Sequence, residues 1–172
     1  MREIIKSLNW RQITIYLTAT LLLVIGLRRF VFLTDIELTE SLANINLTES
    51  STDIVDAFNL ENGAKRLTQL TMWLAVCDLL GLLISGFIIY QLTRKTYRYW
   101  TNLLIILILG FLIVRFKVLD SGIVKQIVLF IGGQFLRFGL GYALLINGVL
   151  LTGLGLFLFY SKRTKELILR AD

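Results

Sequence analysis

The 172-residue chain has no histidine, no proline and a single cysteine, Cys77. Without histidine it lacks the residue needed for bis-histidine haem, for histidine-rich metal sites and for histidine acid–base catalysis. Cys77 has no second cysteine to pair with, so the chain forms no internal disulfide. The absence of proline predicts helices without proline kinks. We therefore expect no cofactor and no metal, and long unbroken helices.

Sequence motifs for enzymatic chemistry are also missing. The chain has no Gly-rich phosphate loop, no cluster of metal ligands and no nucleophile beside a plausible base. Asp78 and Asp120 are separated by predicted helices and form no evident catalytic pair. The net charge of +6 could suggest nucleic acid, but the basic residues flank apolar runs, as membrane topology signals do. We expect a non-catalytic protein that binds no nucleic acid, and an enzyme is the third hypothesis.

Hydrophobic residues make up 56% of the chain and occur in long runs. A helix of ~20 apolar residues spans the ~30 Å hydrocarbon layer of a bilayer. The sequence therefore predicts an all-α, polytopic membrane protein with one membrane domain. Four transmembrane helices are expected, at about 12–33, 67–92, 101–119 and 137–160. An external acidic helical loop at 34–66 joins the first two, and a basic tail occupies 161–172. Segment 123–136 is either an interfacial helix or an extension of the fourth helix.

The distribution of basic residues predicts the orientation. The start of the chain, the turn at 94–98 and the tail after Tyr160 are short and basic, and four crossings place all three on one side. The positive-inside rule makes that side cytoplasmic. An uncleaved first helix and a composition rich in Ile and Leu favour the inner membrane of a bacterial cell. We predict a multi-pass inner-membrane protein with cytoplasmic N- and C-termini.

Ionisable residues occur inside the predicted helices. Asp78 in the second helix and Arg115 in the third lie at similar depths, a few residues outward of the middle. An unpaired charge there costs on the order of 3 kcal/mol or more. We expect Asp78 to pair with Arg115 and so to fix the rotation of the two helices. The alternative is a functional role for Asp78, in a proton or ion relay or in an anion site.

Further basic residues lie near the outer level of the predicted bundle: Arg28, Arg29, Lys117 and Arg137. Together with Arg115 they would make the outer half of the domain cationic. Such a surface could bind phospholipid phosphates, an anionic substrate or an acidic partner. It could equally pair with the acidic loop of the same chain.

Glycines at spacings of seven line the fourth predicted helix: Gly141, Gly148 and Gly155. They fall on one side of the helix and allow the backbone of another helix to approach closely. Two interpretations follow, either packing within the chain or a docking surface for another chain or a lipid.

Two functional hypotheses lead from these features. The first is a non-catalytic integral membrane subunit or scaffold that packs against other membrane protein subunits or forms a homo-oligomer. The second is a small transporter or lipid-handling protein, in which the outer arginines form an outward-facing site for anionic headgroups or solutes. Both include membrane lipids, particularly anionic ones, among the partners.

Overall fold

The computed structural model describes residues 9–48, 62–94, 99–116, 118 and 133–161. Within these ranges every regular element is helical and no residue is in a β-strand, which confirms the predicted all-α class. The elements are α2 (Trp10–Leu33), α3 (Ile36–Thr48), α5 (Gly63–Thr93), α6 (Tyr99–Arg115), the 3₁₀ helix η2 (Leu136–Phe138) and α8 (Leu140–Tyr160). Helices α2, α5 and α8 are long and apolar enough to cross a membrane, and α6 is a shorter apolar helix. These helices support a multi-pass membrane protein.

Several helix bounds differ from those expected from the sequence. The predicted loop 34–66 contains α3 and the first turn of α5, which begins at Gly63. Helix α8 begins at Leu140 rather than at 137, because Gly139 has a φ of 105° that interrupts the helical backbone. Of the predicted segment 123–136 only 133–136 is described. Lys117, Asp120 and the basic tail from 162 lie outside the described residues.

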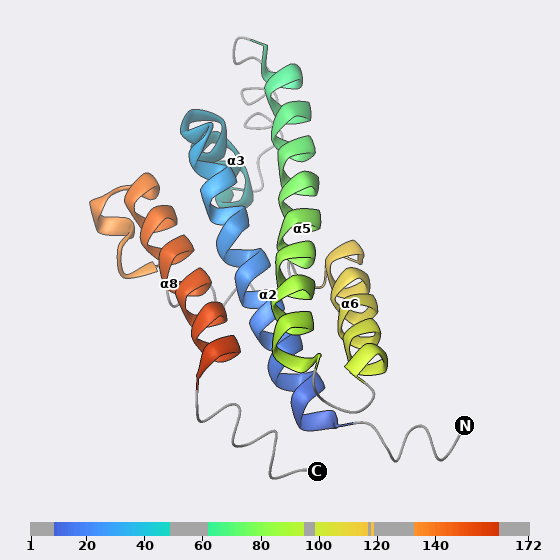
Figure 1. Ribbon diagram of the computed structural model, residues 1–172. Coiled ribbons are helices and arrows are strands. Elements are labelled where there is room, and N and C mark those ends of the chain that lie inside the picture. Colours follow the sequence, from blue (N-terminus) through green and yellow to red (C-terminus); the bar gives the residue numbers. More distant parts are fainter. Residues whose placement is uncertain (1–8, 49–61, 95–98, 117, 119–132, 162–172) are drawn as a thin grey trace.

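Helix α2 occupies the middle of the molecule. It contacts α8 on one side and α5 and α6 on the other, and α5 also contacts α6 (Figure 1). The start of α2 is capped by Asn9, whose side chain accepts a hydrogen bond from the backbone N–H of Gln12 at 3.0 Å. The Thr20 hydroxyl donates a hydrogen bond to the Tyr16 carbonyl oxygen within the helix. This internal bond satisfies a polar group that apolar surroundings would otherwise leave unpaired.

Small residues allow the backbones of α2 and α8 to approach each other closely. A methyl group on Gly155 would lie 2.9 Å from the Ala19 carbonyl oxygen, and one on Gly26 would lie 3.0 Å from the Gly148 carbonyl oxygen. Ala19 and Gly26 are seven positions apart, as are Gly148 and Gly155. Because α2 and α8 are antiparallel, the two pairs of small residues face each other in register. Close packing of this kind stabilises helix pairs in lipid, where no hydrophobic effect drives association.

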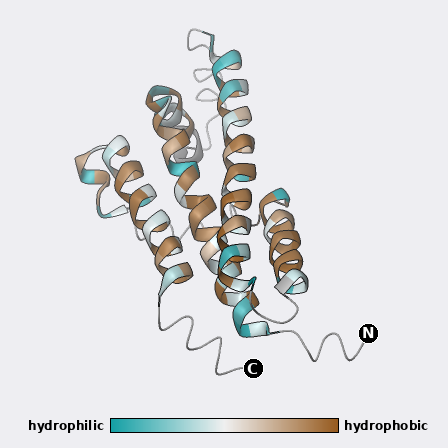
Figure 2. Cartoon of the chain, in the orientation of Figure 1, coloured by the Kyte–Doolittle hydropathy of each residue, from teal (hydrophilic) through white to brown (hydrophobic). Residues whose placement is uncertain are grey.

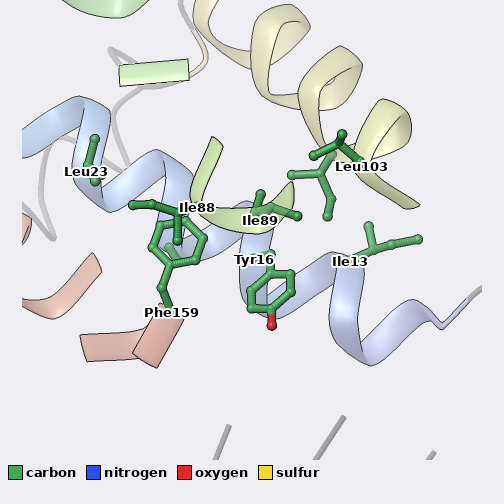
Figure 3. Close-up of a cluster of buried hydrophobic side chains, with 9 residues drawn as sticks. Ile13, Tyr16, Leu23, Ile88, Ile89, Leu103 and Phe159 are labelled. Carbon is green, nitrogen blue, oxygen red and sulfur yellow. The ribbon is translucent and has the colours of Figure 1, made fainter. Parts of the chain in front are cut away.

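A buried apolar cluster joins all four long helices near the end at which α2 begins and α8 ends. Tyr16 of α2 and Phe159 of α8 pack against each other with their rings tilted by 36° and ring centroids 5.7 Å apart. Ile88 and Ile89 of α5 and Leu103 of α6 complete the contacts shown in Figure 3. Phe159 and Ile89 have no solvent-accessible surface. This cluster holds α6 and α8 against opposite sides of α2.

Exposed tryptophan and tyrosine residues mark two levels across the helices. The first level, here the basal end, consists of Trp10, Tyr90, Trp100 and Tyr160. The second, the distal end, is marked by Trp73 on α5 and Tyr142 on α8. Along each of these two helices the levels are about 26 Å apart at ~1.5 Å per residue. Figure 2 shows α5 continuing beyond its apolar part into polar residues. Tryptophan and tyrosine concentrate at membrane–water interfaces, so the two levels fit the boundaries of a bilayer.

The glycine contacts generate a prediction for a matched pair of variants in α8. Gly155→Ala places a methyl group against the backbone of α2, whereas Gly153 has no atom within 4 Å of the corresponding position. We expect Gly155→Ala to lower the free energy of unfolding by about 1–3 kcal/mol, the usual cost of overpacking. Gly153→Ala should cause no loss. Unfolding in detergent micelles measures both, and equal effects of the two variants would contradict the packing interpretation.

Candidate functional site

An ion pair links α2 to α5 between the two aromatic levels. Arg28 donates two hydrogen bonds to Asp78, from Nε to Oδ1 at 2.6 Å and from Nη2 to Oδ2 at 2.8 Å. Both side chains are 15% exposed. The planar guanidinium and the carboxylate therefore meet in the bidentate geometry that gives the strongest pairs of this type. Gly81 lies one turn further along α5 and faces Val24, so the helices are close enough for the short Asp78 side chain to reach its partner.

The predicted partner of Asp78 was wrong. Arg115 is exposed at the end of α6, and Arg28 forms the salt bridge instead. The predicted common depth does agree with the register of α5 and α6, because Gly86 lies against Leu107 and Gly110 lies against Leu82. Continuing that antiparallel register brings Arg115 level with Cys77 and Asp78. The rotation of the helices about their axes decided which arginine paired, and depth alone does not reveal it.

The remaining predicted cations lie on different helices and do not converge on one described site. Arg29 is directed about 100° around α2 from Arg28, and its Cβ faces Gly148 of α8. Arg137 is exposed in η2, with its guanidinium 4.8 Å from the ring centroid of Phe138. Arg115 ends α6, on the other side of α2 (Figure 1). Lys117 lies outside the described residues.

The hydrogen bonds of Asp78 to Arg28 determine what its carboxylate can do. Both of its carboxylate oxygens accept hydrogen bonds from Arg28. Asp78 is also the one acidic residue in the sequences of α2, α5, α6 and α8. A carboxylate held in this way neutralises a membrane-embedded arginine and fixes the α2–α5 register. In the described part of the chain, no cluster of three or more His, Cys, Asp or Glu residues could hold a metal ion.

A second group of charges lies at the distal end. Arg66 of α5 donates from Nε to Asp35 Oδ2 at 2.8 Å, and its Nη2 bonds both Asp35 and Glu37 Oε2, the latter at 3.0 Å. The hydrogen bonds from Arg66 hold the pKa of Asp35 below its ordinary value. Sequence analysis assigned Arg66 to the loop and missed this group. The acid-rich composition after residue 33 and the basic pair before the second apolar run were the available signals.

A buried polar contact at the basal end was also missed. Asn102 of α6 donates from Nδ2 to Gln12 Oε1 of α2 at 2.9 Å. Both residues are buried, with exposures of 7% and 4%. Each side chain satisfies a polar group of the other in apolar surroundings, where an unpaired amide is costly. No local pattern in the sequence shows that these two amides meet.

The predicted glycine face of α8 packs within the chain. Gly148 and Gly155 face α2, and a side chain at Gly141 would lie 3.2 Å from Ile36 at the start of α3. Of the two interpretations of this face, the structure agrees with packing inside the chain. Sequence analysis identified these glycines and missed Ala19 and Gly26, although the latter two have the same spacing of seven.

The ion pair generates a prediction for a double-mutant cycle. Arg28→Gln or Asp78→Asn alone leaves one charge without its partner in the apolar layer, and we expect a loss of about 3 kcal/mol or more in unfolding free energy. The double variant Arg28→Gln/Asp78→Asn removes both charges and should recover part of that loss. Arg11→Gln, at an exposed basal position, is the control. Equal, additive losses from the two single variants would show that the two charges are not coupled.

Comparison with known proteins adds no family to this description, because no family model, curated protein or solved structure matches the chain.

Proposed function

We propose that the chain crosses a bacterial inner membrane four times, with the basal end in the cytoplasm, and acts as a non-catalytic subunit of a membrane complex. The observation that carries this proposal is the use of Asp78. This residue is the sole acid of the four long helices, and it is bonded through both oxygens to Arg28. A carboxylate engaged in this way serves helix packing, which leaves the four long helices without a free carboxylate.

Four crossings are supported by the direction of the helices. Helix α6 starts at the basal end beside Trp100, runs antiparallel to α5 and has 17 residues. This length is at the lower limit of a membrane-spanning helix. Helix α8 then runs antiparallel to α2 and returns to the basal end at Tyr160. A crossing by α6 therefore takes the chain from the basal end, where α5 ends, to the distal end, where α8 begins.

Partner binding is supported by the apolar surface of α5 that the other helices leave uncovered. About a third of the apolar part of α5 is buried within the chain. Large apolar side chains are exposed along it, including Leu83 at 69% and Phe87 at 61%. Helix α5 has 31 residues and extends past Trp73 toward the distal end, where α3 contacts it. We propose that α5 packs against another membrane protein and that its extension with α3 forms the external part of the interface.

Cysteine labelling tests the topology. In a Cys77→Ala background, single cysteines replace Thr68 or Gln134 at the distal end and Arg94 or Ser161 at the basal end. We expect an impermeant maleimide to label the two distal positions in intact cells, and the two basal positions only after permeabilisation. Because α6 separates Arg94 from Gln134, three crossings would instead place these two positions on the same side.

Recovery of a partner tests the functional proposal. Purification from the native membrane in mild detergent should yield a second polypeptide in stoichiometric amount. Leu83→Ala and Phe87→Ala should reduce its recovery about tenfold, which corresponds to losing an interface anchor of about 1.4 kcal/mol. Lipid tails adapt to either side-chain shape, so protein abundance should remain unchanged. Val149→Ala and Leu154→Ala, at exposed positions of α8, are the controls. A chain recovered as a lone monomer would contradict the proposal.

A further inference from the structure

Arg115 does not form the ion pair that the sequence predicts for it. Asp78, which lies at the same level, forms its salt bridge with Arg28. Among the described residues, none of the carboxylates forms a salt bridge with Arg115. Its side chain is exposed at the last turn of α6. A guanidinium that faces lipid at this depth requires an anion or water within reach.

The depth of Arg115 follows from the register of α5 and α6. The contacts of Gly86 with Leu107 and of Leu82 with Gly110 place Arg115 level with Cys77. Cys77 lies about 6 Å along the axis from Trp73, the aromatic marker of the distal level, at ~1.5 Å per residue. Arginine stems extend along apolar surface and carry the charged group to the interface. The guanidinium of Arg115 therefore reaches the layer where lipid phosphates lie.

An apolar stripe continues from Arg115 along the same face of α6. The exposed residues of this stripe are Leu104, Ile108, Phe111 and Leu112. They recur at the spacings of three and four that bring side chains onto one side of a helix. From Leu104 to Arg115 the stripe extends about 16 Å, close to half of the ~30 Å hydrocarbon layer. Its length matches the acyl region of one leaflet, and its charged end lies at the distal side.

We propose that α6 binds one phospholipid of the distal leaflet, with the lipid phosphate on Arg115 and an acyl chain along the stripe. A phosphate offers the guanidinium an anionic acceptor for charge-assisted hydrogen bonds. The lipid completes the span of α6, whose described helix stops short of the distal aromatic level. This inference rests on the proposed four-crossing topology and identifies a ligand for the end of its shortest helix.

Native mass spectrometry of the delipidated full-length protein, titrated with dioleoyl phosphatidylglycerol, tests the site. We expect one lipid to bind ahead of the others, and Arg115→Gln to weaken that binding about fivefold, as for one basic residue near an anionic surface. Arg115→Lys keeps the charge and should retain most of the binding. Inorganic phosphate at equal concentration should not compete, because it lacks the acyl chain that contacts Ile108 and Phe111.

Lys65→Gln is the matched control, since Lys65 is an exposed cation on α5 about 12 Å beyond Trp73 at ~1.5 Å per residue. Its binding should equal that of the wild type. Unchanged lipid binding in Arg115→Gln, or an equal loss in Lys65→Gln, would overturn the inference. Cysteine labelling at Gln134 reports the crossing of α6 independently. Four crossings combined with lipid binding that does not depend on Arg115 would reject the lipid site alone.

Discussion

Backbone contact between α2 and α8 is the interaction on which the other contacts of the molecule depend. Between helices in lipid the hydrophobic effect contributes little, so association relies on van der Waals packing and polar contacts. Gly155 at Ala19 and Gly148 at Gly26 allow that packing at two points. With one face of α2 covered by α8, the opposite face is left for α5 and α6. The order of the helices across the molecule follows from which face of α2 each of them covers.

Charge pairing then fixes how α5 lies against α2. Arg28 of α2 bonds Asp78 of α5, and Asp35, which follows α2, bonds Arg66 of α5. The positive partner is on α2 in the first pair and on α5 in the second. A shift of α5 along α2 would break both pairs and would leave Arg28 without its acceptor in apolar surroundings. The two pairs thus specify one alignment of these antiparallel segments.

The sequence predicts the helices well and their contacts less well. Long apolar runs identified α2, α5 and α8, because membrane-spanning length is a local property of the chain. The bond between Asp78 and Arg28 was not predicted, since Arg28 and Arg115 are equally suitable in depth and only helix rotation separates them. The contact of Asn102 with Gln12 depends on residues far apart in the chain. The glycine face of α8 was found because its spacing of seven is visible in sequence, but the helix that it contacts was not.

The α2–α8 contact has a consequence for biosynthesis. Helix α8 follows α2, α5 and α6 in the chain, so the ribosome has translated all three before α8 exists. Until then the groove at Ala19 and Gly26 has no partner within the nascent protein and must be filled by lipid or by the insertion machinery. The final assembly step is therefore the displacement of that temporary occupant by the last helix. A chain that ended before α8 would therefore leave the α2 surface at Ala19 and Gly26 open to lipid.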